Sequence, residues 1–126
     1  MKVMILGASG QLGSEFRSLE NFSESLSLHF YNRQDLDISS KKLVRSFLRN
    51  NKFDIIINCA AYTDVDEAEN NFNLAKSVNA DAIGHFCEYL EKTYPNTVFI
   101  HISTDYIFDG NFSKPRLRKV AIKNII

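Results

Sequence analysis

The feature that most constrains this chain is a short apolar run that ends in closely spaced glycines. Residues 2–6 (KVMIL) are followed by Gly7, Gly10 and Gly13, and a helical pattern begins within this glycine run and extends over residues 11–19. In a strand–loop–helix unit of this kind, the first glycine permits a tight turn, the second lets the backbone approach a pyrophosphate, and the third allows the helix to pack closely. The helix N-terminus then turns free N–H groups towards the anion. We predict a phosphate-binding loop. The alternative is that the glycines only form the turn between strand and helix and bind no ligand.

The remaining sequence alternates between strand and helix patterns. A polar stretch at 61–70, with Asp64, Asp66, Glu67 and Glu69, is expected to be a loop or a short helix with an acidic first turn rather than a cation site. Further strands are expected at 26–31, 53–59 and 97–102, and further helices from Ser39 or Ser40 to Asn50 and from Phe72 to Tyr94. Apolar helix faces are expected at Leu43, Val44, Phe47 and Leu48, and at Leu74, Ala75, Val78, Ala82, Ile83, Phe86 and Leu90. This order predicts an α/β fold: a Rossmann-like, doubly wound parallel sheet that is incomplete, with about four strands.

Charge and composition exclude several classes of protein. The 15 basic and 15 acidic residues cancel, but residues 1–112 carry a net charge of −5 and residues 113–126 a net charge of +5. A body of this charge is not expected to bind nucleic acid. No apolar run reaches the roughly 18 residues of a membrane helix. The two cysteines and three histidines show no metal-ligand spacing, so we expect a cytoplasmic domain with reduced thiols and no bound metal.

The residues after the second predicted strand indicate which dinucleotide would be preferred. Sites selective for NAD place an acidic residue there to bind the ribose 2′-hydroxyl, whereas NADP sites accommodate the 2′-phosphate with an arginine. Here the strand ends in Tyr31, Asn32 and Arg33, and the first acid is Asp35. Arg33 favours NADPH, and NADH remains possible.

Several segments together resemble the dTDP-4-dehydrorhamnose reductases, a family of extended short-chain dehydrogenase/reductases. They are MKVMILGASGQLG at the start, DLDIS at 35–39, DIIINCAAYTDVDEAE at 54–69, SVNA at 77–80 and HISTDYIFDG at 101–110. The resemblance covers about residues 1–115. It implies NADPH-dependent reduction of the 4-keto group of dTDP-6-deoxy-4-keto-L-mannose, a dTDP-sugar substrate, in the synthesis of dTDP-L-rhamnose.

The resemblance also implies roles for individual residues. Thr104 matches the Ser/Thr of the family's catalytic Thr–Tyr–Lys set, and Asp105 and Tyr106 would lie on the substrate side. Asn79 would tie together the region of the third and fourth strands. The cofactor-binding residues would be Gly7, Ser9, Gly10, Gln11, Leu12, Gly13, Arg33, Asp37, Ile38, Ala60, Ala61, Tyr62, Thr63 and Asn79. From the residues alone, Thr104 and Tyr106 are equally compatible with structural roles at a strand end.

The resemblance stops before the family's catalytic helix. That chemistry requires a Tyr followed four residues later by a Lys, and no tyrosine occurs after Tyr106. We therefore expect residues 1–115 to be an NAD(P)-binding Rossmann domain and residues 116–126 to be a basic tail unlike the family, the product of truncation. A native tail that folds back over the sheet is the alternative.

Two functional hypotheses follow from the sequence. In the first, the chain is the cofactor-binding part of a reductase and is inactive alone. In the second, it is a non-catalytic dinucleotide-binding module with a regulatory or interaction role. A third possibility is a truncated product with neither role, marginally stable and prone to form a homodimer through an uncovered sheet edge.

Overall fold

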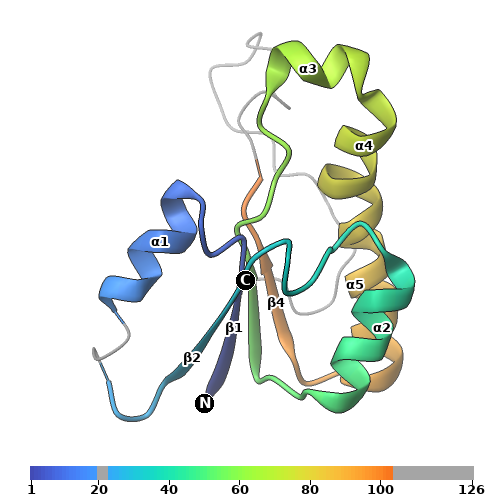
Figure 1. Cartoon of the computed structure of the whole chain (residues 1–126). Coiled ribbons are helices and arrows are strands. Elements are labelled where there is room, and N and C mark those ends of the chain that lie inside the picture. The colour runs from blue at the N-terminus through green and yellow to red at the C-terminus, as the bar shows by residue number, and fades with distance from the viewer. Residues whose placement is uncertain (20–22, 104–126) are drawn as a thin grey trace, which may run out of the picture.

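Four parallel strands form the sheet at the centre of this computed structural model, which describes residues 1–19 and 23–103 (Figure 1). The strands are β1 (Lys2–Leu6), β2 (Ser27–Tyr31), β3 (Ile55–Asn58) and β4 (Val98–His101), in the spatial order β2-β1-β3-β4. In the register of the sheet, Ile5 of β1 is paired with Phe30 on one side and Ile57 on the other. The predicted class, an α/β fold with a parallel sheet, is confirmed.

Helices cover both faces of the sheet. Helix α1 (Gln11–Ser18) lies on one face, and α2 (Lys41–Asn50) and α5 (Ala82–Thr93) lie on the other (Figure 1). The chain reverses its direction of winding after β2, because α2 carries it back across β1 to β3. The carboxyl ends of β1 and β3 therefore flank the topological switch point, which is where open α/β sheets bind their ligands.

The core lies between the sheet and the pair α2 and α5. Met4 and Ile56 of the sheet are fully buried there, together with Val44 of α2 and Phe86 of α5. Phe86 also stacks on Phe99 of β4, with ring centroids 5.3 Å apart. These contacts hold the two helices against the sheet.

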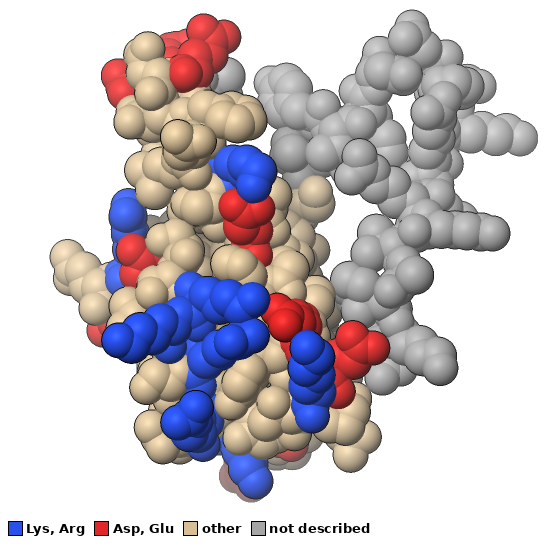
Figure 2. Space-filling view, turned by 90° about the vertical axis from the view of Figure 1, so that its right-hand side faces the viewer, with Lys and Arg blue, Asp and Glu red and all other residues tan. Residues whose placement is uncertain are grey.

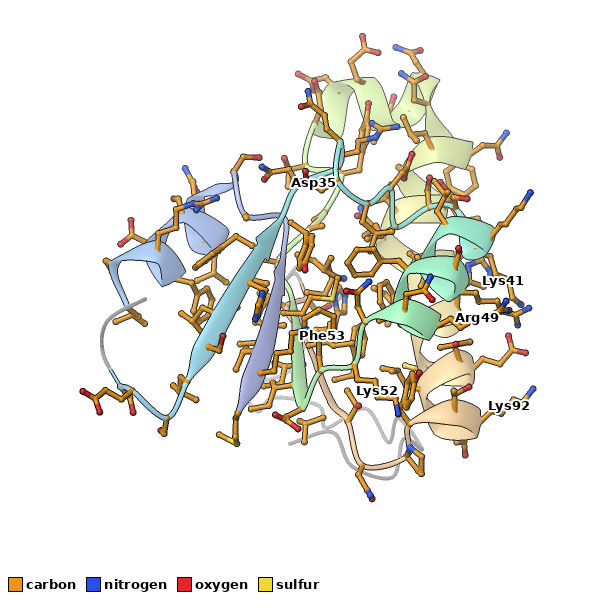
Figure 3. All side chains as sticks on the ribbon, turned by 60° about the horizontal axis from the view of Figure 1, so that its bottom comes forward. Asp35, Lys41, Arg49, Lys52, Phe53 and Lys92 are labelled. Atoms are coloured by element: carbon orange, nitrogen blue, oxygen red, sulfur yellow. The ribbon has the colours of Figure 1, made fainter. Side chains whose placement is uncertain are left out.

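The helix α2 shows how local sequence sets an element's position. The side chain of Ser40 accepts a hydrogen bond from the amide of Leu43, which makes Ser40 the N-cap. Phe47 packs with its ring 6.4 Å from that of Phe53, the buried residue labelled in Figure 3. The expectation for Leu43 was wrong: its side chain is 50% exposed, because it lies on the flank of the helix away from Val44 and Leu48.

The segment from 61 to 94 differs in detail from the predicted pattern. A short helix, α3 (Val65–Asn70), occupies the polar stretch, and the Asp64 carboxylate caps it by accepting from the amide of Glu67. The predicted long helix is present, but it is divided into α4 (Phe72–Lys76), a π-helical turn η1 (Ser77–Asp81) and α5. Its predicted inner face is buried only at Ala82, Phe86 and Leu90.

Candidate functional site

A cleft of about 240 Å³ opens at the carboxyl ends of β1 and β3. Three segments form its walls: the loop between β1 and α1, the residues after β2, and the residues after β3. The lining residues are Leu6, Gly7, Ser9, Gly10, Asn32, Arg33, Leu36, Asp37, Ile38, Cys59, Ala60, Ala61, Tyr62 and Val78. The cleft thus lies at the topological switch point.

Two of the three glycines in the first wall are required by the fold itself. Gly7 has φ 73°, a left-handed conformation, and a Cβ there would stand 2.6 Å from the backbone nitrogen of Ala60. A Cβ at Gly13 would stand 2.8 Å from the Cα of Ala8 and closer still to the carbonyl oxygen of Gly7. The first glycine therefore makes the predicted tight turn. The third allows α1 to pack against the loop that precedes it.

Gly10 differs from the other two glycines. Its φ of −75° is available to any residue, and among the described residues an added Cβ would meet only the carbonyl oxygen of Gly7, at an ordinary distance of 3.4 Å. The fold therefore does not require glycine at position 10. Gly10 lines the cleft, and because it has no side chain, a ligand can come close to its backbone.

The N-terminus of α1 is suited to an anion. Gly10 is the N-cap and provides no side-chain cap, and the first turn of the helix contains no acidic residue. The first amides of a helix have no carbonyl partner inside it, and the helix dipole places partial positive charge at this end. The loop is held in place by two hydrogen bonds that the amides of Gly7 and Ala8 donate to the carbonyl oxygen of Tyr31, at 3.0 and 3.2 Å.

The wall after β2 contains one cation and one fixed carboxylate. Arg33 Nε lies 3.7 Å from Asp37 Oδ2, and the Arg33 side chain is 67% exposed. The hydroxyl of Ser39 donates to Asp37 Oδ1 and is the main cause that lowers the pKa of Asp37 below its ordinary range. Asn32 carries a buried Oδ1 that has no hydrogen-bond partner among the described residues. This wall can therefore offer both a charged and a neutral polar group to a ligand.

The wall after β3 is held by Asn58, a fully buried polar residue. Its Oδ1 accepts from the amide of Ala60 at 3.1 Å, so its Nδ2 is the group that faces His101 Nδ1, at 3.2 Å. His101 Nδ1 must then accept, which requires a neutral ring. Burial lowers the pKa of His101, in agreement with this arrangement. A neutral histidine on β4 thereby positions the chain where it enters the cleft.

Asn79 holds the same wall from the helical side. Its Oδ1 accepts from the amide of Tyr62 at 2.7 Å, and its Nδ2 donates to the carbonyl oxygen of Tyr62 at 3.0 Å. Asn79 lies in the π-helical turn η1, and Val78 beside it lines the cleft. Such turns are frequent at functional sites. Asn79 is thus joined to the segment after β3 and not to the strands themselves.

The structure brings most of the predicted site residues together. Those that line the cleft are Gly7, Ser9, Gly10, Arg33, Asp37, Ile38, Ala60, Ala61 and Tyr62. Gln11, Leu12, Gly13 and Thr63 do not line it, and Asn79 reaches it through Tyr62. The predicted catalytic and substrate-side residues Thr104, Asp105 and Tyr106 lie outside the described residues, as does the tail at 116–126.

Five residues of the cleft are not among the predicted site residues: Leu6, Asn32, Leu36, Cys59 and Val78. Asn32, Leu36 and Cys59 lie in the segments 32–38 and 59–63, whose position after strand ends already indicates a shared cleft, whereas Leu6 and Val78 lie outside those segments. Burial raises the pKa of the Cys59 thiol, which does not favour a nucleophile. Within residues 1–19 and 23–103, no group of three or more His, Cys, Asp or Glu side chains could hold a metal ion. None of the helices in that part of the chain has the length and apolar character needed to cross a bilayer.

A doubly wound sheet, a glycine loop at the switch point and a helix N-terminus that faces the cleft together define a Rossmann-like domain of the nucleotide-binding class. A comparison with protein families makes this more specific. The profile of the RmlD substrate binding domain matches residues 1–122. The chain belongs to this family.

Named relatives agree with the family. The chain is 36% identical, over 116 residues, to a dTDP-4-dehydrorhamnose reductase of Burkholderia thailandensis, and the match covers 91% of this chain and 37% of that protein. Among solved structures, the dTDP-4-dehydrorhamnose reductase of Clostridium acetobutylicum matches with a TM-score of 0.82 and 32% identity, over 98% of this chain and 43% of that one. The Bacillus anthracis enzyme, crystallised in complex with NADP, matches with a TM-score of 0.78 and 33% identity, over 88% and 38%. The chain therefore spans little more than a third of the length of the curated relatives that it matches, and it is homologous to their N-terminal, NADP-binding part.

Proposed function

We propose that the cleft binds the adenosine and pyrophosphate parts of NADP(H), and that the chain serves as the cofactor-binding part of a reductase. The observation that carries this proposal is Gly10. Its backbone lines the cleft at the N-terminus of α1, and packing within the protein gives no reason for a glycine there. A pyrophosphate lying against the backbone gives that reason.

The proposal favours NADPH over NADH because of Arg33. The guanidinium lies on the wall after β2, where the ribose of the adenosine would be placed, and it is exposed enough to turn from Asp37 towards a 2′-phosphate. Asn32 stands where NAD-selective sites carry an acid, so no carboxylate at that position repels the phosphate. NADH remains a second, weaker ligand in this proposal.

The proposed reaction is that named in the relatives: reduction of the 4-keto group of a dTDP-linked deoxysugar, with hydride from the nicotinamide. In this chain, Thr104 is proposed to orient the substrate carbonyl, with Asp105 and Tyr106 beside it. The chain contains no Tyr followed by Lys at the fourth position after it. In the family, this Tyr protonates the alkoxide that forms on the substrate, and the Lys lowers the pKa of the Tyr. Because both are absent, we propose that the 126 residues alone do not catalyse the reduction.

Calorimetric titration of the chain with NADPH and with NADH tests the cofactor proposal. We expect saturable 1:1 binding with NADPH tighter than NADH, and no binding of either would overturn it. Oxidation of NADPH in the presence of dTDP-6-deoxy-4-keto-L-mannose tests the proposed inactivity. A rate like that of an intact reductase would refute it while leaving the binding proposal in place.

The second candidate, a non-catalytic dinucleotide-binding module with a regulatory or interaction role, is favoured by the same missing Tyr and Lys. It shares the binding prediction with the first candidate and differs in what restores turnover. Adding a separate polypeptide that carries the remaining part of a related reductase should restore NADPH oxidation if the chain is part of an enzyme. Binding of NADPH without any such restoration would favour the regulatory module.

A further inference from the structure

A pair of polar side chains lies behind the cleft, at the carboxyl ends of β3 and β4. In the register of the sheet, Asn58 is paired with His101, and each ends a strand whose other residues are apolar. Asn58 is fully buried and His101 is partly buried. Neither residue lines the cleft, so the ligand contacts proposed above do not explain why polar groups stand there.

The single amide group of Asn58 serves two contacts at once. Its Oδ1 accepts from the backbone amide of Ala60, and its Nδ2 faces His101 Nδ1. The oxygen and the nitrogen of an amide point in different directions, so the group cannot offer its oxygen to both neighbours. Both contacts are made only while His101 Nδ1 accepts, which means while the ring is neutral. The state of the ring is therefore coupled to the amide of Ala60.

A proton on the ring of His101 breaks this arrangement. The new Nδ1–H faces the Nδ2 group of Asn58, and both are donors. If Asn58 turns its oxygen towards the ring, its nitrogen meets the N–H of Ala60, and that bond is lost instead. Because Asn58 is fully buried, a group left without a partner cannot turn to solvent, which makes the loss costly.

Ala60 carries this change to the cleft. It lines the wall after β3, and its backbone nitrogen is so close to Gly7 that a Cβ added to the glycine would stand 2.6 Å from it. The wall after β3 and the glycine loop thus meet at Ala60. A displacement of the Ala60 amide therefore disturbs two walls of the cleft together.

We propose that Asn58 and His101 are a positioning pair that makes dinucleotide binding depend on pH. The cleft has its binding geometry while the His101 ring is neutral and loses it when the ring takes up a proton. This inference rests on the proposed function, because the dinucleotide is the ligand whose affinity changes. By linkage, a ligand that binds the neutral form better must itself bind more weakly as the pH falls.

The surroundings of His101 place its titration on the acidic side of its ordinary range. Burial lowers its pKa below 6.5, and a hydrogen bond with the backbone of β3 acts in the opposite direction as the smaller cause. The thiol of Cys59, also beside this wall, has a raised pKa and is neutral. On the helical side, Lys, Arg, Asp and Glu side chains lie on the outer surface (Figure 2). The titratable groups that η1 and the start of α5 add are Asp81, which lies 2.6 Å from Lys76 Nζ, and His85.

Calorimetric titration of the chain with NADP⁺ at several pH values between about 7.5 and 5 tests the proposal. The oxidised cofactor is used because reduced nicotinamides decompose in acid. Its 2′-phosphate takes up a proton of its own at about pH 6, so each variant is compared with the native chain at the same pH. Circular dichroism at each pH checks that the chain is folded.

Two substitutions of His101 separate the acceptor from the titrating proton. His101→Asn offers an amide oxygen near the place of Nδ1 and does not titrate in this range. The affinity of the native chain should fall at least about threefold further than that of His101→Asn between about pH 7.5 and 5. His101→Leu has no acceptor, so it should bind weakly throughout and show no fall beyond that of His101→Asn. The matched control His85→Gln removes the imidazole of the helical side and should keep the native pH dependence.

Nuclear magnetic resonance of the chain without ligand gives a second, independent readout. In the native chain, the amide proton of Ala60 should shift with the same midpoint as the ring of His101, because protonation removes its acceptor. In His101→Asn the amide of Ala60 should show no such transition. A role of His101 in stability alone would not move this amide in a folded chain.

The outcomes separate this inference from the proposed function. Absence of NADP⁺ binding at every pH overturns the proposed function, and the pH-dependent binding with it. Binding with the same pH dependence in the native chain and in His101→Asn overturns this inference alone, as does an Ala60 amide that does not follow the titration of His101. Where His101→Asn does not fold, the amide of Ala60 in the native chain decides.

Discussion

Substituting the glycines of the loop one at a time separates packing within the protein from binding of a ligand. At Gly13, an added methyl group stands 2.8 Å from the Cα of Ala8, which is shorter than the 3.0 Å below which Cβ contacts are essentially never found. The neighbouring atom belongs to the backbone, so it cannot rotate away as the end of a side chain could. Overpacking of this kind costs about 1–3 kcal/mol, and the higher helix propensity of Ala returns up to about 1 kcal/mol. Gly13→Ala should therefore lower the free energy of unfolding by roughly 1–2 kcal/mol, a fall in Tm of about 4–8 °C.

At Gly10 the same change should leave stability nearly unaltered. The backbone has φ −75° and ψ 171°, which alanine adopts freely, and the methyl group meets its nearest neighbour at 3.4 Å. Alanine is a poorer N-cap than glycine by about 0.5 kcal/mol, and the lower entropy of its unfolded chain offsets a similar amount. The methyl group would stand where we propose that a pyrophosphate lies against the backbone. We expect NADPH affinity to fall at least tenfold, which is about 1.4 kcal/mol.

The assay is a pair of measurements on each variant: thermal unfolding by circular dichroism and calorimetric titration with NADPH. Gly84→Ala is the matched control, because no atom of residues 1–19 and 23–103 lies within 4 Å of an added Cβ there, and α5 should gain about 1 kcal/mol while affinity stays constant. If Gly10→Ala binds NADPH like the native chain, the pyrophosphate does not lie at Gly10 and the proposed function loses the observation that carries it. If Gly10→Ala unfolds as early as Gly13→Ala, the steric argument itself is wrong.

Three further substitutions test the walls of the cleft. Arg33→Ala should weaken NADPH roughly tenfold and leave NADH unchanged in calorimetric titrations, because only NADPH presents a 2′-phosphate; equal losses for both would count against the role of Arg33. Asn79→Ala removes both hydrogen bonds to Tyr62 and should lower the free energy of unfolding in urea by about 1–2 kcal/mol while also weakening NADPH, and an unchanged affinity would show that this wall does not contact the ligand. Burial lowers the pKa of His101 below its ordinary value of 6.5. When the pH falls below 6.5, the unfolded chain therefore binds a proton that the folded chain does not yet bind, so the free energy of unfolding should fall as the pH falls through 6.5. His101→Gln should reduce this dependence between about pH 7.5 and 5.5 in urea titrations, and a slope equal to that of the native chain would refute the neutral-ring assignment.

Local sequence signals predicted most of the fold because each is made by neighbouring residues. The glycine loop, the apolar runs and the cap at Ser40 act within a few positions of the chain, and the strands are found within two residues of where their patterns placed them. The parts that sequence could not supply depend on contacts between distant residues. The exposure of Leu43 depends on the flank of α2 that faces the sheet, and the π-helical turn at η1 is a local change in helix type that a helical pattern does not signal. The role of Asn58 rests on its contacts with Ala60 and His101, and nothing in the local sequence distinguishes Asn58 from an ordinary strand residue.

Contacts between described residues hold all three walls of the cleft, which bears on what this part of the chain can do alone. Tyr31 fixes the glycine loop, Asn58 and His101 fix the start of the wall after β3, and Asn79 fixes its continuation at Tyr62. None of these contacts needs a residue beyond β4. A binding site whose supporting groups are already bonded to one another is preorganised, and its affinity is not reduced by the ordering of loose segments. In the function that we propose, cofactor binding and turnover are therefore separable: the first would depend on residues that the four-stranded sheet positions, and the second on the family's Tyr–Lys pair, which this sequence does not contain.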